Sequence, residues 1–276
     1  DGTDKKVVLK KERHESDQNV VQSFILEGDI RVGYIYLPDF YTRWDDEAEG
    51  GRCADDVARE IIRLKKEKID GIILDLRFNG GGSLFEARAM AGIFIDEGPL
   101  AMVRTRDKKV VTLKDMNRGT VYDGPLILMV NAQSASASEV LAASIQDYNR
   151  GLIVGSRTHG KATGQNLFPI DGTAVTSHVN KNGLSSIGYV KVTTQKLFRV
   201  TGKSAQGRGV MPDVMLPDVV SALEVSESGY PFALSCDSVP ANPYYIPLSP
   251  LRKEELQQLS RERLAKDSIF QGLQET

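Results

Sequence analysis

The chain is poor in the residues that mark several protein classes. Its 276 residues include only two cysteines and three histidines. Cys53 and Cys236 match no zinc-binding spacing, so they predict no metal site and do not fix the redox compartment. No apolar run approaches the roughly 20 residues of a membrane span, and a net charge of −2 argues against a nucleic-acid partner. We therefore expect neither a membrane span nor nucleic-acid binding in this chain.

What is present is typical of a globular α/β domain. Hydrophobic residues make up 41% of the chain and charged residues 26%. An amphipathic helix over 54–66 lies between expected strands at 31–37 and 71–76. Strand, helix and strand in this order form a βαβ unit, which predicts a partly parallel sheet.

The segment from Gly124 to Gln165 contains the most informative pattern. The apolar run 126–130 predicts a buried strand, and a helix at 3.6-residue spacing follows it and stops at Gly151. A second strand at 152–154 leads to a turn that carries Lys161. If the two strands are parallel neighbours, the start of the helix and the lysine turn lie at the same edge of the sheet.

Three serines, Ser134, Ser136 and Ser138, lie at the start of this helix. Ser136 and Glu139 form an S-x-x-E pattern, which predicts a helix capping box. The same position also suits a nucleophile, because the free N–H groups and the dipole at a helix N-terminus stabilise an oxyanion. Local sequence leaves both interpretations open.

A serine nucleophile needs a base, and Lys161 is the candidate with no adjacent carboxylate in sequence. A free lysine has a pKa of about 10.4, and burial lowers it. An ordinary surface lysine is the plain alternative. His159, two residues earlier, leaves a Ser-His arrangement as a further alternative, and the chain has no G-x-S-x-G motif.

The stretch from S-A-S-A-S-E to G-K-A-T-G-Q resembles the carboxy-terminal processing proteases, close to their tail-specific protease branch. In that family the serine and lysine lie 25 residues apart, which matches Ser136 and Lys161 here. The resemblance implies Ser136 as nucleophile, Lys161 as general base and Gln165 as the residue that orients the amine. It extends from about Gly33 to Pro217, and His159 departs from it by replacing an aromatic residue.

The glycine-rich stretch D-L-R-F-N-G-G-G ends at Gly82 and also matches the family. Taken alone it predicts a tight turn that needs positive φ. The resemblance implies that the amides of Gly81 or Gly82, together with that of Ala137, form the oxyanion hole.

Three further residues match the family and are expected to support the site. Glu139 and Thr158 are expected to hold the helix cap and the lysine turn. Asp147 lies eleven residues after Ser136, roughly 16 Å along a helix axis, so it cannot contact that serine directly. We expect Asp147 to be structural and to pair with Arg150.

The flanking sequence predicts additional β-structure. Strands are expected at 110–113 and 120–122, and again at 165–170, 173–179 and 188–194, where they could pair with an extended peptide. Short strands are also expected at 7–9 and 24–26.

The resemblance implies a crotonase-like α/β catalytic core over residues 31–217 with β-rich flanking segments. Residues 1–30 would end a preceding region whose peptide-binding PDZ domain is not in this chain. Residues 218–276 would form a Pro-rich segment and a C-terminal helical tail.

The implied function is a serine endopeptidase that cleaves proteins near their C-termini through an acyl-enzyme, without metal or cofactor. Its partners would be protein or peptide substrates and an adaptor protein, and its location would be the periplasm or cell envelope. A non-catalytic ligand- or protein-binding module on the same fold is the alternative.

Overall fold

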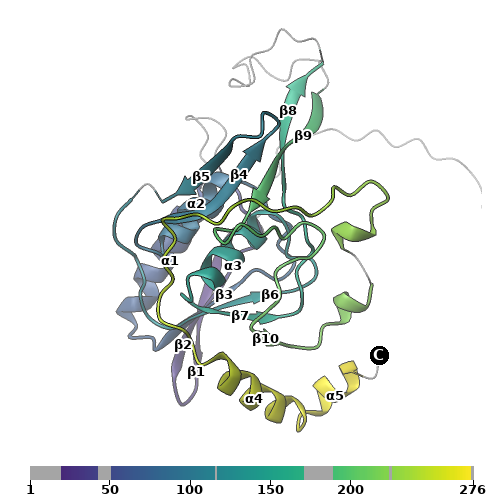
Figure 1. Cartoon of the computed structure of the whole chain (residues 1–276). Coiled ribbons are helices and arrows are strands. Elements are labelled where there is room, and N and C mark those ends of the chain that lie inside the picture. The colour runs from purple at the N-terminus through teal and green to yellow at the C-terminus, as the bar shows by residue number, and fades with distance from the viewer. Residues whose placement is uncertain (1–19, 43–50, 116, 171–188, 224–225, 275–276) are drawn as a thin grey trace, which may run out of the picture.

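A six-stranded sheet forms the centre of the protein (Figure 1). The computed structural model describes residues 20–42, 51–115, 117–170, 189–223 and 226–274. The strands run in the order β1-β2-β3-β6-β7-β10, and β1 pairs antiparallel with β2 while the others are parallel. Their bounds are β1 Gln22–Glu27, β2 Arg31–Tyr36, β3 Gly71–Asp75, β6 Leu126–Val130, β7 Leu152–Gly155 and β10 Val214–Met215. β6 and β7 are parallel neighbours, so the condition under which the start of the helix and the lysine turn share one sheet edge is met.

A second, antiparallel sheet contains four strands in the order β5-β4-β9-β8. They are β4 Pro99–Thr105, β5 Val110–Lys114, β8 Thr163–Pro169 and β9 Tyr189–Phe198. The ends of β8 and β9 project from the body of the protein (Figure 1). The register of this pair shifts between Gly164 and Gln165, which is a β-bulge beside the lysine turn.

The predicted strand at 120–122 is wrong. The N–H groups of Val121 and Tyr122 both donate to Ile93 O, so this stretch lies against the end of the preceding helix and not beside β5. The expected strands at 7–9 and 173–179 lie outside the described residues.

Three helices cover the sheets, namely α1 Cys53–Lys66, α2 Leu84–Gly92 and α3 Ala137–Asp147. α1 carries acidic residues in its first turn and basic residues in its last, as the helix dipole favours. α2 packs against both α1 and α3, and α3 contacts β7 and β4, so it touches both sheets. α3 is thereby fixed against both sheets.

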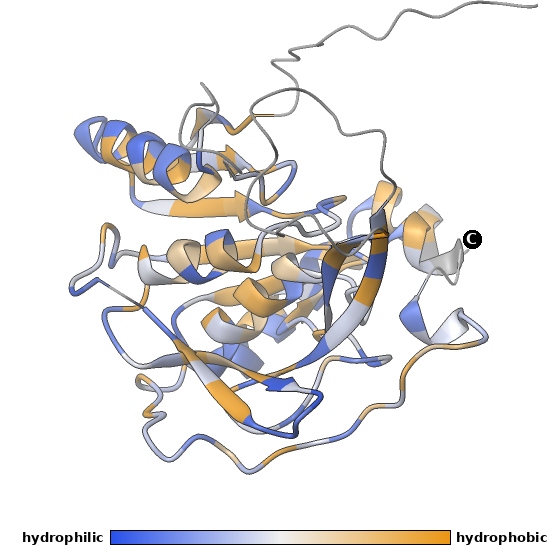
Figure 2. Cartoon of the chain, turned by 90° about the horizontal axis from the view of Figure 1, so that it is seen from above, coloured by the Kyte–Doolittle hydropathy of each residue, from blue (hydrophilic) through white to orange (hydrophobic). Residues whose placement is uncertain are grey.

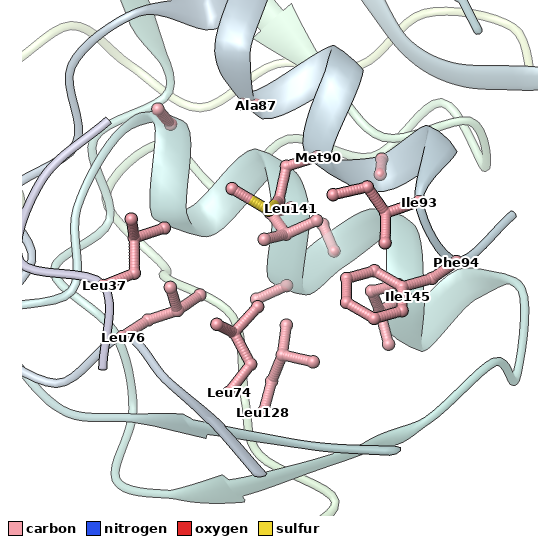
Figure 3. Close-up of a cluster of buried hydrophobic side chains, with 14 of the residues drawn as sticks. Leu37, Leu74, Leu76, Ala87, Met90, Ile93, Phe94, Leu128, Leu141 and Ile145 are labelled. Atoms are coloured by element: carbon pink, nitrogen blue, oxygen red, sulfur yellow. The ribbon is translucent and has the colours of Figure 1, made fainter. Parts of the chain in front are cut away.

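The hydrophobic core lies between the central sheet and these helices. Figure 3 shows Leu74 and Leu128 from the sheet facing Met90, Leu141 and Ile145 from α2 and α3. All five side chains are fully buried. Burying one such side chain contributes about 1.5–3 kcal/mol, so the core holds the strand ends and the start of α3 rigidly. Figure 2 shows hydrophobic residues concentrated in these interior elements and hydrophilic ones in outer helices and turns.

The chain after β10 follows the outside of this core. It contains the 3-10 helices η2 (Val219–Leu223) and η3 (Glu227–Gly229), then α4 (Lys253–Leu264) and α5 (Ser268–Gln274). Lys253 Nζ binds Asp213 Oδ1 at 2.9 Å and Gln257 donates to Asp213 O, which fixes α4 beside β10. Within the described ranges, no helix is long and apolar enough to cross a bilayer.

Candidate active site

Ser136 sits at the turn between β6 and α3, in a backbone conformation that side chains rarely adopt. Its φ is 56° and its ψ −110°. Such strain costs about 1–3 kcal/mol and persists only where the surroundings impose it, most often at functional sites. The side chain is half-buried at the N-terminus of α3.

The two neighbouring serines are structural. Ser134 and Ser138 are fully buried. Ser134 Oγ donates to Leu76 O at 2.8 Å and accepts from Asn131 N, while Ser138 Oγ donates to Asn79 O at 2.9 Å. Both hydroxyls are therefore engaged in fixing the loops, and Ser136 alone of the three faces partly to solvent.

The carboxylate of Glu139 links the serine turn to the lysine turn. Its Oε2 accepts from Ser136 N at 2.9 Å and from Lys161 N at 2.8 Å. Its Oε1 accepts from Gly160 N at 2.7 Å and from Thr158 Oγ1 at 2.6 Å. Glu139 is buried, and burial raises its pKa while these four hydrogen bonds oppose the rise. One side chain thus holds the backbones of Ser136 and Lys161 together.

Thr158 extends this link to the loop around Val210. While its hydroxyl donates to Glu139, it also accepts from Val210 N at 2.6 Å. Thr158 N donates to Val210 O at 3.2 Å. The lysine turn is therefore fixed from α3 on one side and from residue 210 on the other.

The Lys161 amine is half-buried and bound to neutral acceptors. Its Nζ donates to Gln165 Oε1 at 3.1 Å and to Thr163 O at 3.2 Å. Gln165 Nε2 in turn donates to Thr163 Oγ1 and Thr193 Oγ1, which fixes the orientation of its oxygen. Burial lowers the pKa of Lys161, and Lys191 lowers it further, while the charges of Glu227 and Glu139 raise it. Within the described residues, neither bond of the amine goes to Ser136 Oγ.

The glycine loop packs directly on the serine turn. Gly81 has φ 107°, and a Cβ there would lie 2.8 Å from both Ala135 O and Ser136 Cβ. Gly81 N donates to Asn79 Oδ1 at 2.9 Å, so this amide is already occupied. Gly82 pairs with Phe40 through bonds of the flanking amides, Phe40 N to Gly81 O and Ser83 N to Phe40 O. That pairing does not use the Gly82 N–H. Among the described residues, neither the Gly82 N–H nor the Ala137 N–H in the first turn of α3 has a hydrogen-bond acceptor, so both are available.

Asp147 pairs with a different arginine from the one expected. Arg199 donates to both of its oxygens, with Nη2 2.6 Å from Oδ1. The expected partner, Arg150, donates instead to Phe94 O and Tyr122 O. Asn149, at φ 53°, ends the helical path between the two residues and turns Arg150 away. Asp147 therefore fixes the end of α3 to Arg199, the residue directly after β9, at the other end of the helix from Ser136.

The side chain of His159 contacts the chain that follows the core. Its Nε2 lies 3.6 Å from Glu227 Oε2, and its ring lies 6.3 Å from that of Tyr230. Both partners belong to the segment 226–234 that follows the core. The same segment borders a cavity of about 350 Å³ that Lys161, Gln165 and Thr193 line from the other side. The described residues contain no cluster of His, Cys, Asp or Glu that could hold a metal ion.

Comparisons with known proteins identify the family of the chain and agree with its mixed α/β fold. A model of Peptidase family S41 matches residues 31–216, and the chain belongs to this family. A tail-specific protease of Haemophilus influenzae is 34% identical over 228 residues, which cover 83% of this chain and 31% of that protein. A carboxy-terminal-processing protease of Bartonella bacilliformis is 31% identical over 192 residues, covering 69% of this chain and 39% of that protein. The chain thus spans roughly a third of these relatives' lengths.

Among solved structures, a photosystem II D1 C-terminal processing protease superposes with a TM-score of 0.57 at 26% identity. The match covers 72% of this chain and 48% of that one. An S41 protease from Bacteroides fragilis gives the same TM-score at 19% identity, covering 77% and 54%, and so supports the fold alone. The chain therefore has the mixed α/β fold of the C-terminal processing proteases.

Several residues of the site were not predicted from the sequence. Asn79 fixes the glycine loop, since its Nδ2 donates to Leu37 O and its backbone oxygen accepts from Ala135 N and Ser138 Oγ. The feature of the sequence that could have indicated this role is the position of Asn79 between a buried strand and three glycines. Glu227 and Gln206 lie far along the chain from the lysine turn, and no local pattern links them to it.

Proposed function

We propose that this chain is the catalytic region of a serine endopeptidase that cleaves polypeptides near their C-termini with a Ser136–Lys161 dyad. Ser136 differs from Ser134 and Ser138 in the ways that a nucleophile requires, and this contrast carries the proposal. It is the one hydroxyl of the three that is partly exposed, and it lies at a strained helix N-terminus beside two available amides. We also propose that the core is crotonase-like, that the protein has a PDZ domain ahead of this core and that it is located in the cell envelope.

In the first step, Ser136 Oγ attacks the carbonyl carbon of the scissile peptide while the neutral Lys161 amine takes its proton. The amine must first turn from Thr163 O toward the serine, which its flexible stem allows. Catalytic hydrogen bonds often form fully only when substrate is bound. Gln165 would then stabilise the ammonium that results, since its oxygen already accepts from Nζ.

The tetrahedral intermediate carries a negative oxygen, which the N–H groups of Ala137 and Gly82 would stabilise. Lys161 returns the proton to the leaving amine, the peptide C–N bond breaks and an acyl-enzyme remains on Ser136. Water, deprotonated by the same amine, hydrolyses this ester and restores the serine. The lowered pKa of Lys161 favours each step, because more of the amine is neutral near pH 8 than for an ordinary lysine.

A cleavage assay on an unfolded model protein, read by mass spectrometry, tests this function. Wild-type chain should cut, whereas Ser136→Ala and Lys161→Ala should lose about 100-fold or more of the rate. Ser221→Ala, on an exposed serine of η2, is the matched control and should cut like wild type. Retained cleavage by pure Ser136→Ala protein refutes the assignment.

Covalent labelling with a sulfonyl fluoride separates the enzyme from a non-catalytic binding module. A reactive dyad forms an adduct on Ser136 at a rate that rises with pH. The pH at which this rate is half of its plateau should lie below the ordinary lysine pKa of 10.5. Absence of both adduct and cleavage would favour the binding module.

A further inference from the structure

Segment 226–234 lies outside the residues that match the family model, yet it reaches the lysine turn. Glu227 N donates to His159 O at 3.0 Å, and Glu227 Oε1 accepts from Gln206 Nε2 at 3.1 Å. Gln206 Oε1 accepts from Ala162 N at 2.9 Å. Glu227 is therefore connected to the residue just after Lys161 and to the residue two positions before it.

The Glu227 carboxylate also faces the same cavity as the Lys161 amine. Its side chain is only 16% exposed, so water screens its charge less than at the surface. The amine itself has only neutral hydrogen-bond acceptors among the described residues, Gln165 Oε1 and Thr163 O.

We propose that Glu227 is a positioning residue for Lys161: it fixes the turn that carries the base, and its charge stabilises the protonated amine. This inference rests on the proposed function, because it assigns Lys161 the role of general base. Burial favours the neutral form of the Lys161 amine, and the Glu227 charge favours its protonated form. The chain after the core therefore takes part in setting the pH at which the base is active.

Every charged group facing the amine bears on this balance. Glu139 from α3 acts in the same direction as Glu227, and Lys191 from β9 acts against both. His159, in the lysine turn itself, lies 3.6 Å from the Glu227 carboxylate. The four donors bound to Glu139 already occupy its oxygens, whereas among the described residues Glu227 accepts one hydrogen bond, from Gln206 Nε2.

Two substitutions separate the charge of Glu227 from its geometry. Glu227→Gln removes the charge and keeps the length, so the midpoint of the pH dependence of Ser136 sulfonylation should move to lower pH. The direction follows from the sign: without the carboxylate the protonated amine is less stable, and the pKa of Lys161 falls further. Glu227→Asp keeps the charge but shortens the reach, so the plateau rate should fall about tenfold or more, since a 1 Å displacement of a reacting group can cost about 100-fold.

The matched control is Glu255→Gln, which removes an exposed carboxylate from α4 and should change neither midpoint nor plateau. Thermal unfolding of each variant checks that it folds, and if Glu227→Gln does not, Glu227→Ala replaces it as the test of the charge. An unchanged midpoint in folded Glu227→Gln overturns the charge effect, and an unchanged plateau in Glu227→Asp overturns the positioning. If wild-type protein itself forms no Ser136 adduct, the proposed function fails and not this inference alone.

Discussion

Replacing Glu139 by glutamine should destabilise the protein and slow the chemistry of Ser136 together. The buried carboxylate accepts four hydrogen bonds, two on each oxygen. Glutamine offers one oxygen and one NH₂ group in the same space. Its best orientation keeps the oxygen on Ser136 N and Lys161 N, and turns the NH₂ group toward Gly160 N and Thr158 Oγ1.

In that orientation one backbone donor, Gly160 N, faces another donor and loses its acceptor. A buried unsatisfied donor costs about 1–3 kcal/mol. Thr158 Oγ1 can accept from the new NH₂ group, so its loss is smaller. We therefore expect Glu139→Gln to lower the free energy of unfolding by about 2 kcal/mol, which corresponds to a melting temperature lower by roughly 4–8 °C for a chain of this size.

Thermal or urea unfolding measures the first effect and the rate of Ser136 sulfonylation the second. Glu139→Ala would leave all four donors without an acceptor and costs about 4 kcal/mol or more. That approaches the whole stability of a domain, about 5–15 kcal/mol, so little folded protein is expected. Glu255→Gln again serves as the surface control. If Glu139→Gln unfolds within about 0.5 kcal/mol of wild type, the four bonds do not hold the two turns as described.

Two further predictions concern the packing around the site. Gly81→Ala should lose about 2 kcal/mol of stability and most of its reactivity toward the sulfonyl fluoride, because its Cβ would lie 2.8 Å from Ser136 Cβ at a φ of 107°; Gly80→Ala, whose Cβ would meet no atom within 4 Å, should unfold within about 0.5 kcal/mol of wild type. Asp147→Ala should cost about 3 kcal/mol in urea unfolding because it leaves the half-buried Arg199 without its carboxylate, and the double variant with Arg199→Ala should cost less than the sum of the two single changes; additive losses would contradict a direct pair.

The elements that were predicted correctly are those whose sequence pattern is contained within a few consecutive residues. β6 was predicted at its observed bounds, Leu126–Val130, because five apolar residues are bounded by Pro125 and Asn131. The parallel pairing of β6 with β7 also follows from sequence, since an intervening helix leaves a parallel crossover as the common solution.

The errors arise where a residue's partner is set by the three-dimensional path of the chain. Asp147 and Arg150 are three apart, a spacing that would bring them together on a continuous helix. The helix instead ends at Asp147, and left-handed Asn149 directs Arg150 to Phe94 O. The spacing rule holds only within the helix, and the sequence did not show that the helix stops between the two.

Glu227 illustrates a different limit. The proposed nucleophile, the lysine and the carboxylate that joins their backbones all lie between residues 136 and 161, so one local pattern could identify them. Yet the half-burial of Lys161 depends on a segment more than sixty residues further along. Burial lowers the pKa of a lysine and a facing carboxylate raises it, and here both come from the fold. The sequence could therefore indicate which amine to propose as the base. Under this proposal, the pH at which it acts depends on a contact that exists only once the chain after the core has folded against the lysine turn.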